Sequence, residues 1–542
     1  MYLSPKINLL LLVSAIAQVF AIGISFNPAR AQSITPANDG TNTQVTTNGN
    51  QIDIDGGTRA GANLFHSFEK FGLNQNEIAN FLSTGDIQNI LGRITGGNAS
   101  VINGLIQVTG GNPNLFLVNP SGIFFGPNAT LNVPADFTAT TATNIGIGEN
   151  WFNAFGENNY SILTGSPNGF VFSNLQPGSI VNAGNLTVNS GSNLNLFGGT
   201  VASTGELSGG NITVATVPGE NLLRITPKGH LLSLEIPASV TSTNTSVASL
   251  PELLTGSGTS VNPGDVVANK VTAQNATLSA EKNLTLVESQ LQTAGNLNLL
   301  AKDTVFVRDS VANPFVAIAG GNLYVQGNQS IDILALNHPQ IPFQSGGNLS
   351  LVSDGIVSGD AHFASGGQFK ISTLSGEPGN FVSLFDPIIF SQGDVELGDY
   401  TGASLHILAG GSVKTGKVEI TGTGTANDTI NPANPDSFIA NLANVTLSDG
   451  SSVEIDGSKS PTLDIRAGVD WDALGGLPQD NIIGSVSPSS ISDSATGSSI
   501  TVGKVTVKSS TGDKGSVFLT NQFQPNQNLE SGEIKKRRWG GG

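Results

Sequence analysis

A short segment that recurs at a fixed interval constrains this chain more than any other feature of its sequence. The segment reads glycine, asparagine, leucine, any residue and a further aliphatic residue. Its leucine occurs at Leu297, Leu323 and Leu349, 26 residues apart each time. Looser versions follow at residues 367–371 and 402–407. Alternation of apolar and polar residues is the mark of a β-strand, and repeats of roughly 20–50 residues are typical of solenoids, propellers and arrays.

The length of the repeat distinguishes between these architectures. A propeller blade needs about 40–45 residues and four strands, so the 26-residue unit is too short for one. In a parallel β-helix each coil contributes two or three short strands, and the coils stack about 4.8 Å apart. We therefore predict an all-β chain that forms a right-handed parallel β-helix, a pectin-lyase-like solenoid. At roughly 20–26 residues per coil, we expect about 20–25 coils and a rod on the order of 100 Å long.

The composition agrees with stacked coils. Charged residues make up only 12% of the chain, and 68 of its 542 residues are glycine. Each side chain in a stack lies over its counterpart in the next coil, so like charges would repel, whereas stacked asparagines gain hydrogen bonds. The net charge of −17 argues against a nucleic-acid partner, because phosphates need cationic contacts. The absence of cysteine excludes a disulfide scaffold and cysteine-bound zinc.

The N-terminus has the pattern of an export signal. Lys6 precedes an apolar stretch over residues 9–26, and Ala29-Arg30-Ala31 has the spacing of a signal-peptidase site. We predict a signal peptide over residues 1–31, so that the mature chain begins at Gln32. The alternative interpretation is a transmembrane anchor, since the apolar stretch approaches the ~18 residues that a spanning helix requires.

The N-terminal half carries sequence blocks that differ from the generic repeat. In order, they are LFHSFEKF at 64–71, NILGRITGG at 89–97, INGLI at 102–106 and NLFLVNPSGIFFGPNA at 114–129. This ordered set resembles the N-terminal secretion domain of filamentous haemagglutinin-like exoproteins, the two-partner secretion (TPS) family. The resemblance implies a β-helix with a capped N-terminal end and extra-helical strands.

The same resemblance implies a function. The secretion domain would be recognised in the periplasm by the periplasmic repeat domains of a dedicated outer-membrane barrel, which then passes the chain to the cell surface. We therefore expect a secreted or surface-exposed protein of a double-membrane bacterium. By family analogy its role would be that of an adhesin or haemagglutinin-like protein, with a cell-surface or polysaccharide target.

Two tetrapeptide turns match motifs of that family. They are Asn119-Pro120-Ser121-Gly122, for the family's Asn-Pro-Asn-Gly, and Asn112-Pro113-Asn114-Leu115, for its Asn-Pro-Asn-Leu. Ser121 replaces the second asparagine of the first motif, which we take as the main candidate for transporter recognition, with the second motif as a weaker one. Proline fixes φ in such a turn, and the preceding asparagine caps it. Two roles stay open at this point: direct contact with the transporter, or the shaping of two corners of a coil.

Composition suggests where the chain divides. We predict a secretion domain over residues 32–255, a β-helical stem over 270–520 and a polar, basic tail over 521–542. Residues 136–170, with Trp151, Phe152 and Phe155, break the coil rhythm and are candidates for the extra-helical part. Residues 222–225 and 231–234 read as a further hairpin. We expect core packing rather than ligand binding for six phenylalanines, namely Phe65, Phe68, Phe71, Phe116, Phe124 and Phe125.

Parallel β-helices also include polysaccharide lyases and glycosidases, so an enzyme is the alternative function. Hydrolysis needs two carboxylates about 5–10 Å apart. The candidates are the pairs Asp53/Asp55 and Asp470/Asp472, and neither recurs one coil later beside a basic residue. The five histidines form no close pair in the sequence, and we expect His66 to be a packed or surface residue. They lie at positions 66, 230, 338, 362 and 406. We therefore predict no enzyme, no catalytic residue, no cofactor and no metal site.

Overall fold

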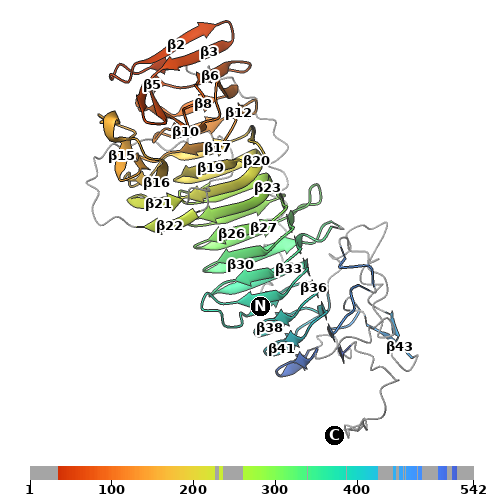
Figure 1. Cartoon of the computed structure of the whole chain (residues 1–542). Helices are drawn as coiled ribbons and strands as arrows, with labels where there is room; N and C mark the ends of the chain where they lie inside the picture. The colour runs from red at the N-terminus through yellow and green to blue at the C-terminus, as the bar shows by residue number, and fades with distance from the viewer. Residues whose placement is uncertain are drawn as a thin grey trace, which may run out of the picture.

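The computed structural model describes residues 34–225 and 261–424, apart from 339 and 386, together with strand 231–235 and shorter stretches between 444 and 521. The predicted signal peptide, His230 and residues 522–542 lie outside the described residues. The described part is built from strands, forty of which join in one sheet that winds into a parallel β-helix (Figure 1). This confirms the predicted fold class. No described helix is long and apolar enough to cross a membrane.

One coil of the stem shows how the repeat maps onto the helix. Strands β26 (Leu297–Ala301), β27 (Thr304–Arg308) and β28 (Val316–Ala319) form its three sides, and β29 (Leu323–Gly327) begins the next coil. Parallel pairing places Leu297 beside Leu323, and Leu323 beside Leu349 of β32 (Leu349–Val352). The 26-residue repeat is therefore one complete coil, as the sequence predicts.

The looser repeats divide between two sides of the coil. Phe369 in β34 (Phe369–Ser372) continues the same ladder above Leu349. Residues 402–407 do not, because β39 (Leu405–Ala409) pairs with β36 (Ile388–Ser391) on another side. Their assignment to this repeat is wrong. The later coils shorten, and the apolar alternation that marks one side also occurs on the others. The ladder continues instead through Val395 and Val413.

A single column of apolar side chains runs through the core along this ladder. Within the described residues it has fourteen rungs: Leu64, Ile90, Leu115, Phe137, Leu194, Ile212, Ala276, Leu297, Leu323, Leu349, Phe369, Val395, Val413 and Ile500. At about 4.8 Å per rung the column spans on the order of 60 Å. The expected 20–25 coils are too many, because long excursions leave the helix after rungs 137, 212 and 413.

The first of these excursions contributes to an antiparallel sheet outside the coils. Its order is β15 (Asn150–Asn153), β14 (Asn144–Ile147), β16 (Pro167–Phe172), β21 (Asn221–Ile225) and β22 (Leu231–Glu235). The predicted hairpin at 222–234 is thus confirmed as β21–β22. Residues 137–140 prove to be a coil strand, β13 (Phe137–Thr140), rather than part of the excursion.

The extra-helical sheet covers an apolar patch on the outer face of the coils. Phe65 and Phe116 point into this patch and pack with Phe152, Phe170 and other residues of the sheet. Phe68, Phe71 and Phe125 lie inside the coils, as expected, whereas Phe124 is only half-buried. Phenylalanines of the N-terminal half therefore pack in two separate cores, one inside the helix and one beneath the added sheet.

The N-terminal end of the helix is closed by an antiparallel cap. Strand β2 (Thr43–Asn48) pairs with β3 (Gln51–Gly56), while β1 (Thr35–Pro36) and β4 (Thr58–Ala60) pair with β5 (Asn63–Lys70). Strand β3 then lies parallel to β6 (Ile78–Leu82), which starts the regular stacking. The cap appears at the red end of the rod in Figure 1.

Candidate functional site

The two predicted turn motifs flank one strand, β10 (Asn114–Val118), so they form two corners of the same coil. In the first corner Asn112 is exposed and Pro113 is buried. Leu115 is a core rung between Ile90 and Phe137. The motif at 112–115 therefore begins a strand of the coil, and Asn112 is its exposed member.

The corner at 119–122 is closed by Asn119. Its side-chain oxygen accepts a hydrogen bond from the backbone N–H of Ser121 at 3.0 Å, and the backbone N–H of Gly122 donates to the carbonyl of Asn119 at 2.9 Å. Pro120 occupies the second turn position, and Gly122 has a φ of 111°, in the region that favours glycine. This is the turn that the sequence predicts.

The same asparagine also fastens the turn to the coil before it. Asn119 Nδ2 donates to the carbonyl of Asn98 at 2.9 Å and to Ser100 Oγ at 3.0 Å. On the other side the backbone packs against Gly178, where a Cβ would lie 2.5 Å from the Pro120 carbonyl oxygen. Asn119 is fully buried, and all four residues of the turn are classed as buried. Ser121 Oγ has no hydrogen-bond partner within the part of the chain that the structure describes.

Asn114 belongs to a ladder of polar side chains that runs beside the apolar column. Asn89 Nδ2 donates to Asn63 Oδ1 at 2.8 Å, and Asn114 Nδ2 donates to Asn89 Oδ1 at 2.9 Å. Asn63 Nδ2 in turn donates to the carbonyls of Leu163 and Gly165, in the extra-helical excursion. The ladder thus links the 112–115 corner to the excursion through two intervening rungs.

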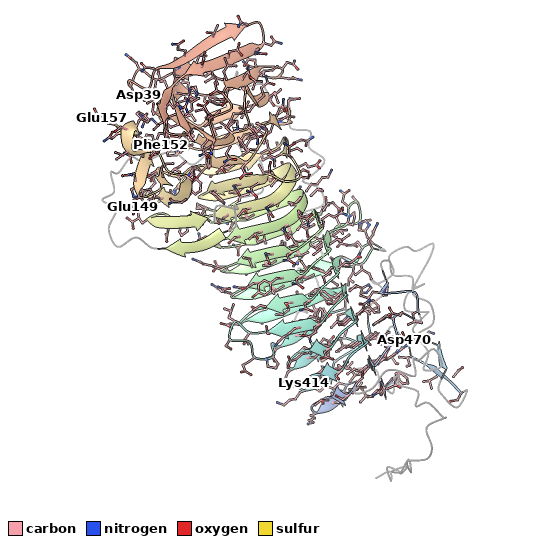
Figure 2. All side chains as sticks on the ribbon, in the orientation of Figure 1. Asp39, Glu149, Phe152, Glu157, Lys414 and Asp470 are labelled. Atoms are coloured by element: carbon pink, nitrogen blue, oxygen red, sulfur yellow. The ribbon has the colours of Figure 1, made fainter. Side chains whose placement is uncertain are left out.

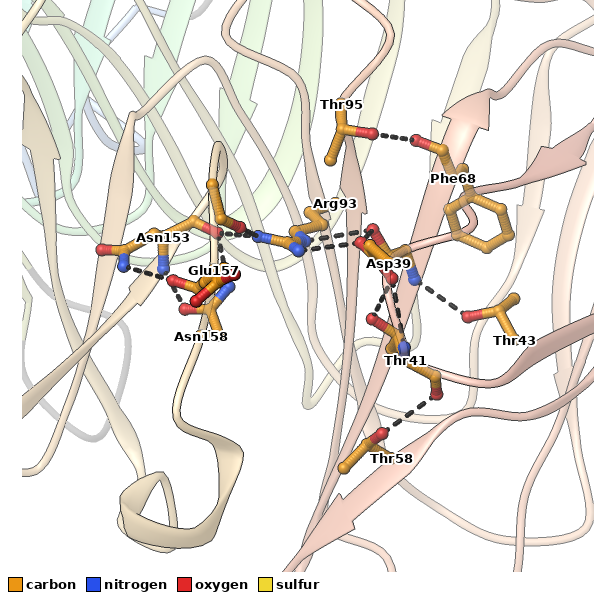
Figure 3. Close-up of polar contacts among 12 residues, drawn as sticks. Asp39, Thr41, Thr43, Thr58, Phe68, Arg93, Thr95, Asn153, Glu157 and Asn158 are labelled. Atoms are coloured by element: carbon orange, nitrogen blue, oxygen red, sulfur yellow. Dashed lines mark hydrogen bonds and ion pairs between the residues drawn. The ribbon is translucent and has the colours of Figure 1, made fainter.

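A buried arginine joins the cap, the coil and the excursion (Figure 3). Arg93, only 2% exposed, pairs with Asp39 of the cap at 2.8 Å and donates to Ser67 Oγ at 3.0 Å. Its other terminal nitrogen donates to the carbonyls of Asn153 and Gly156 at 2.8 and 2.7 Å. Each of the three guanidinium nitrogens of Arg93 thus has an acceptor, which offsets the cost of removing the charge from water.

The carboxylate of Asp39 is held by several donors at once. Ser67 Oγ donates to it at 2.5 Å, and the backbone N–H and hydroxyl of Thr41 donate at 3.1 and 2.5 Å. Burial by itself would raise the pKa of Asp39, but the hydrogen bonds from Ser67, Thr41 and Arg93 outweigh it and lower the pKa from 3.8 to about 2. Asp39 is therefore ionised at neutral pH and supplies the counter-charge for Arg93.

Sequence reasoning missed this network, although one signal for it was present. Arg93 interrupts the strand β7 (Asn89–Ile94), which is otherwise free of charge and is buried along its whole length. A buried arginine requires a partner. Its partner Asp39 lies 54 residues earlier, outside the sequence blocks that carry the resemblance.

Among the carboxylates considered for catalysis, that of Asp53 is engaged by neighbouring side chains. Asp53 accepts hydrogen bonds from Gln51 and Asn80 at 2.7 Å each. Asp470 and Asp472 flank Trp471, which is buried and donates from its indole nitrogen to the Ser391 carbonyl at 2.7 Å. Among the described residues, no three acidic or histidine side chains form a group that could hold a metal ion.

The four described histidines lie in different surroundings, although His362 and His406 share one column of the helix, on either side of Ile388. His66 is fully buried in the cap coil, and His362 is buried in the stem. His406 contacts Asp464 at 3.0 Å, and Arg466 donates to the same carboxylate at 2.9 and 2.8 Å, so these three form a second buried polar cluster. His338 is half-buried and contacts the Ser310 carbonyl at 2.7 Å.

Comparison with known proteins shows which family the N-terminal part of the chain matches. Residues 31–269 match the family model of the TPS secretion domain, which confirms the resemblance drawn from the sequence blocks. No curated protein matches the chain.

Two solved structures are similar to it at low sequence identity. The HMW1 secretion domain from Haemophilus influenzae is 17% identical, with a TM-score of 0.36, and the match covers 72% of this chain and 94% of that one. The filamentous hemagglutinin secretion domain is 15% identical, with a TM-score of 0.23, over 71% of this chain and 96% of that one.

Proposed function

Because residues 31–269 match the TPS secretion domain, we propose that this chain is a two-partner exoprotein whose N-terminal domain is read by the periplasmic repeat domains of a dedicated outer-membrane barrel. The family match is the observation that carries this proposal. The chain would then cross the outer membrane and remain exposed at the surface or be released.

Within this function, the turn at Asn119-Pro120-Ser121-Gly122 would act by holding the domain's recognition surface in shape. Its burial supports this role over direct contact, because the folded domain leaves no face of Asn119 open to a partner. Replacing Asn119 by alanine removes its bonds to Asn98, Ser100 and Ser121. Such a loss costs about 2–3 kcal/mol, since buried groups are left unpaired.

The test is secretion with the barrel co-expressed. We expect Asn119→Ala and Pro120→Ala to remain in the periplasm, measured by immunoblotting of periplasmic and extracellular fractions. Asn313→Ala is a matched control, because Asn313 also precedes a proline but lies in an exposed turn of the stem. Normal secretion of all three variants would remove the turn at 119–122 from the export function.

Adhesion is the role that a long exposed rod suits best. Stacked coils bearing uncharged polar side chains present an extended surface, and the family analogy favours binding to a cell surface or a polysaccharide. The test is agglutination and surface binding by the purified mature chain. Binding that is abolished by deletion of stem coils would support adhesion, and a chain that binds no cells or polysaccharides would contradict it.

A further inference from the structure

The extra-helical excursion displays apolar side chains that its own core does not use. Trp151, Phe155 and Ile162 are 43%, 38% and 48% exposed, and each is next in sequence to a buried residue. The inward neighbours are Phe152, Ala154 and Leu163, which are at most 1% exposed. The core is therefore already filled by one set of side chains, and the other set faces outward.

These residues are close in the chain and are tied to one another. Asn150 Nδ2 donates to the Ile162 carbonyl at 3.1 Å, which brings the two ends of segment 150–162 together. Of the aromatic side chains in the described part of the chain, Trp151 and Phe155 are the two that are exposed, while the other large exposed apolar residues there are aliphatic and lie elsewhere, among them Val517 and Leu519 on strand β47 (Ser516–Asn521). Soluble proteins rarely group exposed aromatic residues without a binding function.

The segment is also held rigid. Arg93 anchors the backbone on both sides of Phe155, through the carbonyls of Asn153 and Gly156. The amide of Asn158 further bridges to the backbone of Asn153 at 2.8 and 3.0 Å. A surface fixed before binding loses little conformational entropy when it binds, and tryptophan is enriched among the residues that contribute most to binding at protein interfaces.

The charge around the segment indicates what it would bind. Glu149 and Glu157 flank it at the same edge of the N-terminal part (Figure 2), and residues 142–172 contain no lysine, arginine or histidine. A complementary partner surface is therefore apolar at its centre and basic at its rim. The segment lies within residues 31–269, the part of the chain that matches the secretion domain.

We propose that Trp151, Phe155 and Ile162, flanked by Glu149 and Glu157, form the docking surface for the periplasmic domains of the outer-membrane transporter. This inference rests on the proposed two-partner function. It assigns recognition to the exposed segment and leaves the buried turn at 119–122 a positioning role.

The experiment uses the full chain co-expressed with the outer-membrane barrel of the proposed two-partner system. We expect Trp151→Ser/Phe155→Ser to lower the secreted fraction at least tenfold, and Glu149→Lys/Glu157→Lys to lower it through repulsion. The matched controls are Leu175→Ser/Val311→Ser, which change two apolar residues that are 69% and 86% exposed, and Glu69→Lys, which changes an exposed glutamate of the cap. Unchanged thermal unfolding of each purified variant would show that folding is intact. A photo-crosslinking residue at position 151 should capture the barrel, and one at position 311 should not.

The outcomes separate the two proposals. Secretion of the wild type together with normal secretion of both segment variants would overturn the docking surface and leave the two-partner function standing. Normal secretion of both segment variants, together with loss of their binding to polysaccharide, would overturn the docking surface in favour of a sugar-binding role. A wild type that the barrel does not secrete would overturn the two-partner function and the docking surface with it.

Discussion

Buried polar residues occur in the first coils as well as in the stem, and His66 is one of them. His66 points into the core of the cap coil, beside the rings of Phe68 and Phe81, where later coils place aliphatic side chains such as Leu117. Neither ring nitrogen of His66 has a hydrogen-bond partner within the described residues. A buried polar group without a partner costs about 1–3 kcal/mol, so the fold carries this residue at the expense of stability.

His66 makes the stability of the cap depend on pH. Burial lowers its pKa from 6.5 to about 4, against a smaller opposing effect of Asp55. Between about pH 6.5 and about pH 4, His66 is protonated in the unfolded chain but not in the folded one. The free energy of unfolding therefore decreases as the pH falls from about 6.5 to about 4. We expect His66→Leu to be more stable at pH 7 and to flatten this dependence, by about 2–3 kcal/mol at pH 4. Hydrogen exchange of residues 63–94 at pH 7 and pH 4.5 measures the stability of the cap in the wild type and in His66→Leu. An equal loss of stability in the two proteins between these pH values would contradict the prediction.

Asp39 governs the next pH range down. Its folded pKa of about 2 lies below the ordinary 3.8, so its contribution is complete above about pH 4 and is lost as the pH falls toward 2. The contribution is on the order of 1 kcal/mol, because the carboxylate is partly exposed and water screens it. We expect Asp39→Asn to lower the stability of the cap at pH 7 and to remove the slope between pH 4 and 2. Urea unfolding at pH 7, pH 4 and pH 2 measures the stability of the wild type and of Asp39→Asn, with Asp86→Asn as an exposed control.

At the scale of the strand, one polar ladder explains why glycine and asparagine recur together. In the stem, the backbone N–H of Asn348 donates to Asn322 Oδ1, and that of Asn322 donates to Asn296 Oδ1, each at 2.8 Å. A Cβ on Gly321 would lie 2.5 Å from Asn296 Oδ1. Each asparagine thus occupies the space that the next coil leaves free by having glycine, so the two residue types are required as a pair.

The ladder should matter most where it is buried. Asn89 is buried and bonds to Asn63 and Asn114, so Asn89→Ala removes the donor to Asn63 Oδ1 and the acceptor of Asn114 Nδ2, and we expect a loss of about 2 kcal/mol. Asn322→Ala exposes the N–H of Asn348 to water, and we expect a loss below about 1 kcal/mol. Urea unfolding of both variants measures the difference. Equal losses would mean that burial does not set the value of a rung.

Charges follow the same stacking rule. Where charged residues do share a column, their signs alternate: Glu396 pairs with Lys370 at 3.2 Å on one side and with Lys414 at 2.8 Å on the other. Opposite charges in neighbouring coils avoid the repulsion that stacked like charges would cause.

The sequence predicts well those structural features that are determined by residues within a single coil. The rungs at 297, 323 and 349 follow from spacing, because corner, ladder and core all recur within one segment. The excursions do not follow, since Asp39, Arg93 and Asn153 meet across 54 and 60 residues and no periodicity relates them. The sequence predicts the turn at 119–122 but not its burial. The turn is covered by the backbone at Gly178, which follows the first extra-helical excursion in the chain.

At the scale of the whole molecule, stability is close to a sum over neighbouring coils. Each coil contacts the one before it and the one after it, as in repeat proteins whose damage stays local. The N-terminal cap and the extra-helical sheet add further contacts to the first coils, through the second apolar cluster and Arg93. The secretion domain should therefore remain folded when a stem coil is disrupted.

A charge in the middle of the stem tests this independence. Leu323 is a fully buried rung, and Leu323→Asp places a carboxylate in the core, where no partner is available to offset its burial. We expect limited proteolysis to cut the coils around residue 323 while residues 34–225 stay protected. Ser350→Asp is the matched control: it lies on the outer side of the same ladder, one coil later, beside Lys370, and should leave the whole rod resistant. Loss of protection over residues 34–225 in Leu323→Asp would mean that the rod unfolds as a single cooperative unit. The secretion domain could then not persist as an independent recognition module while the stem behind it is unfolded.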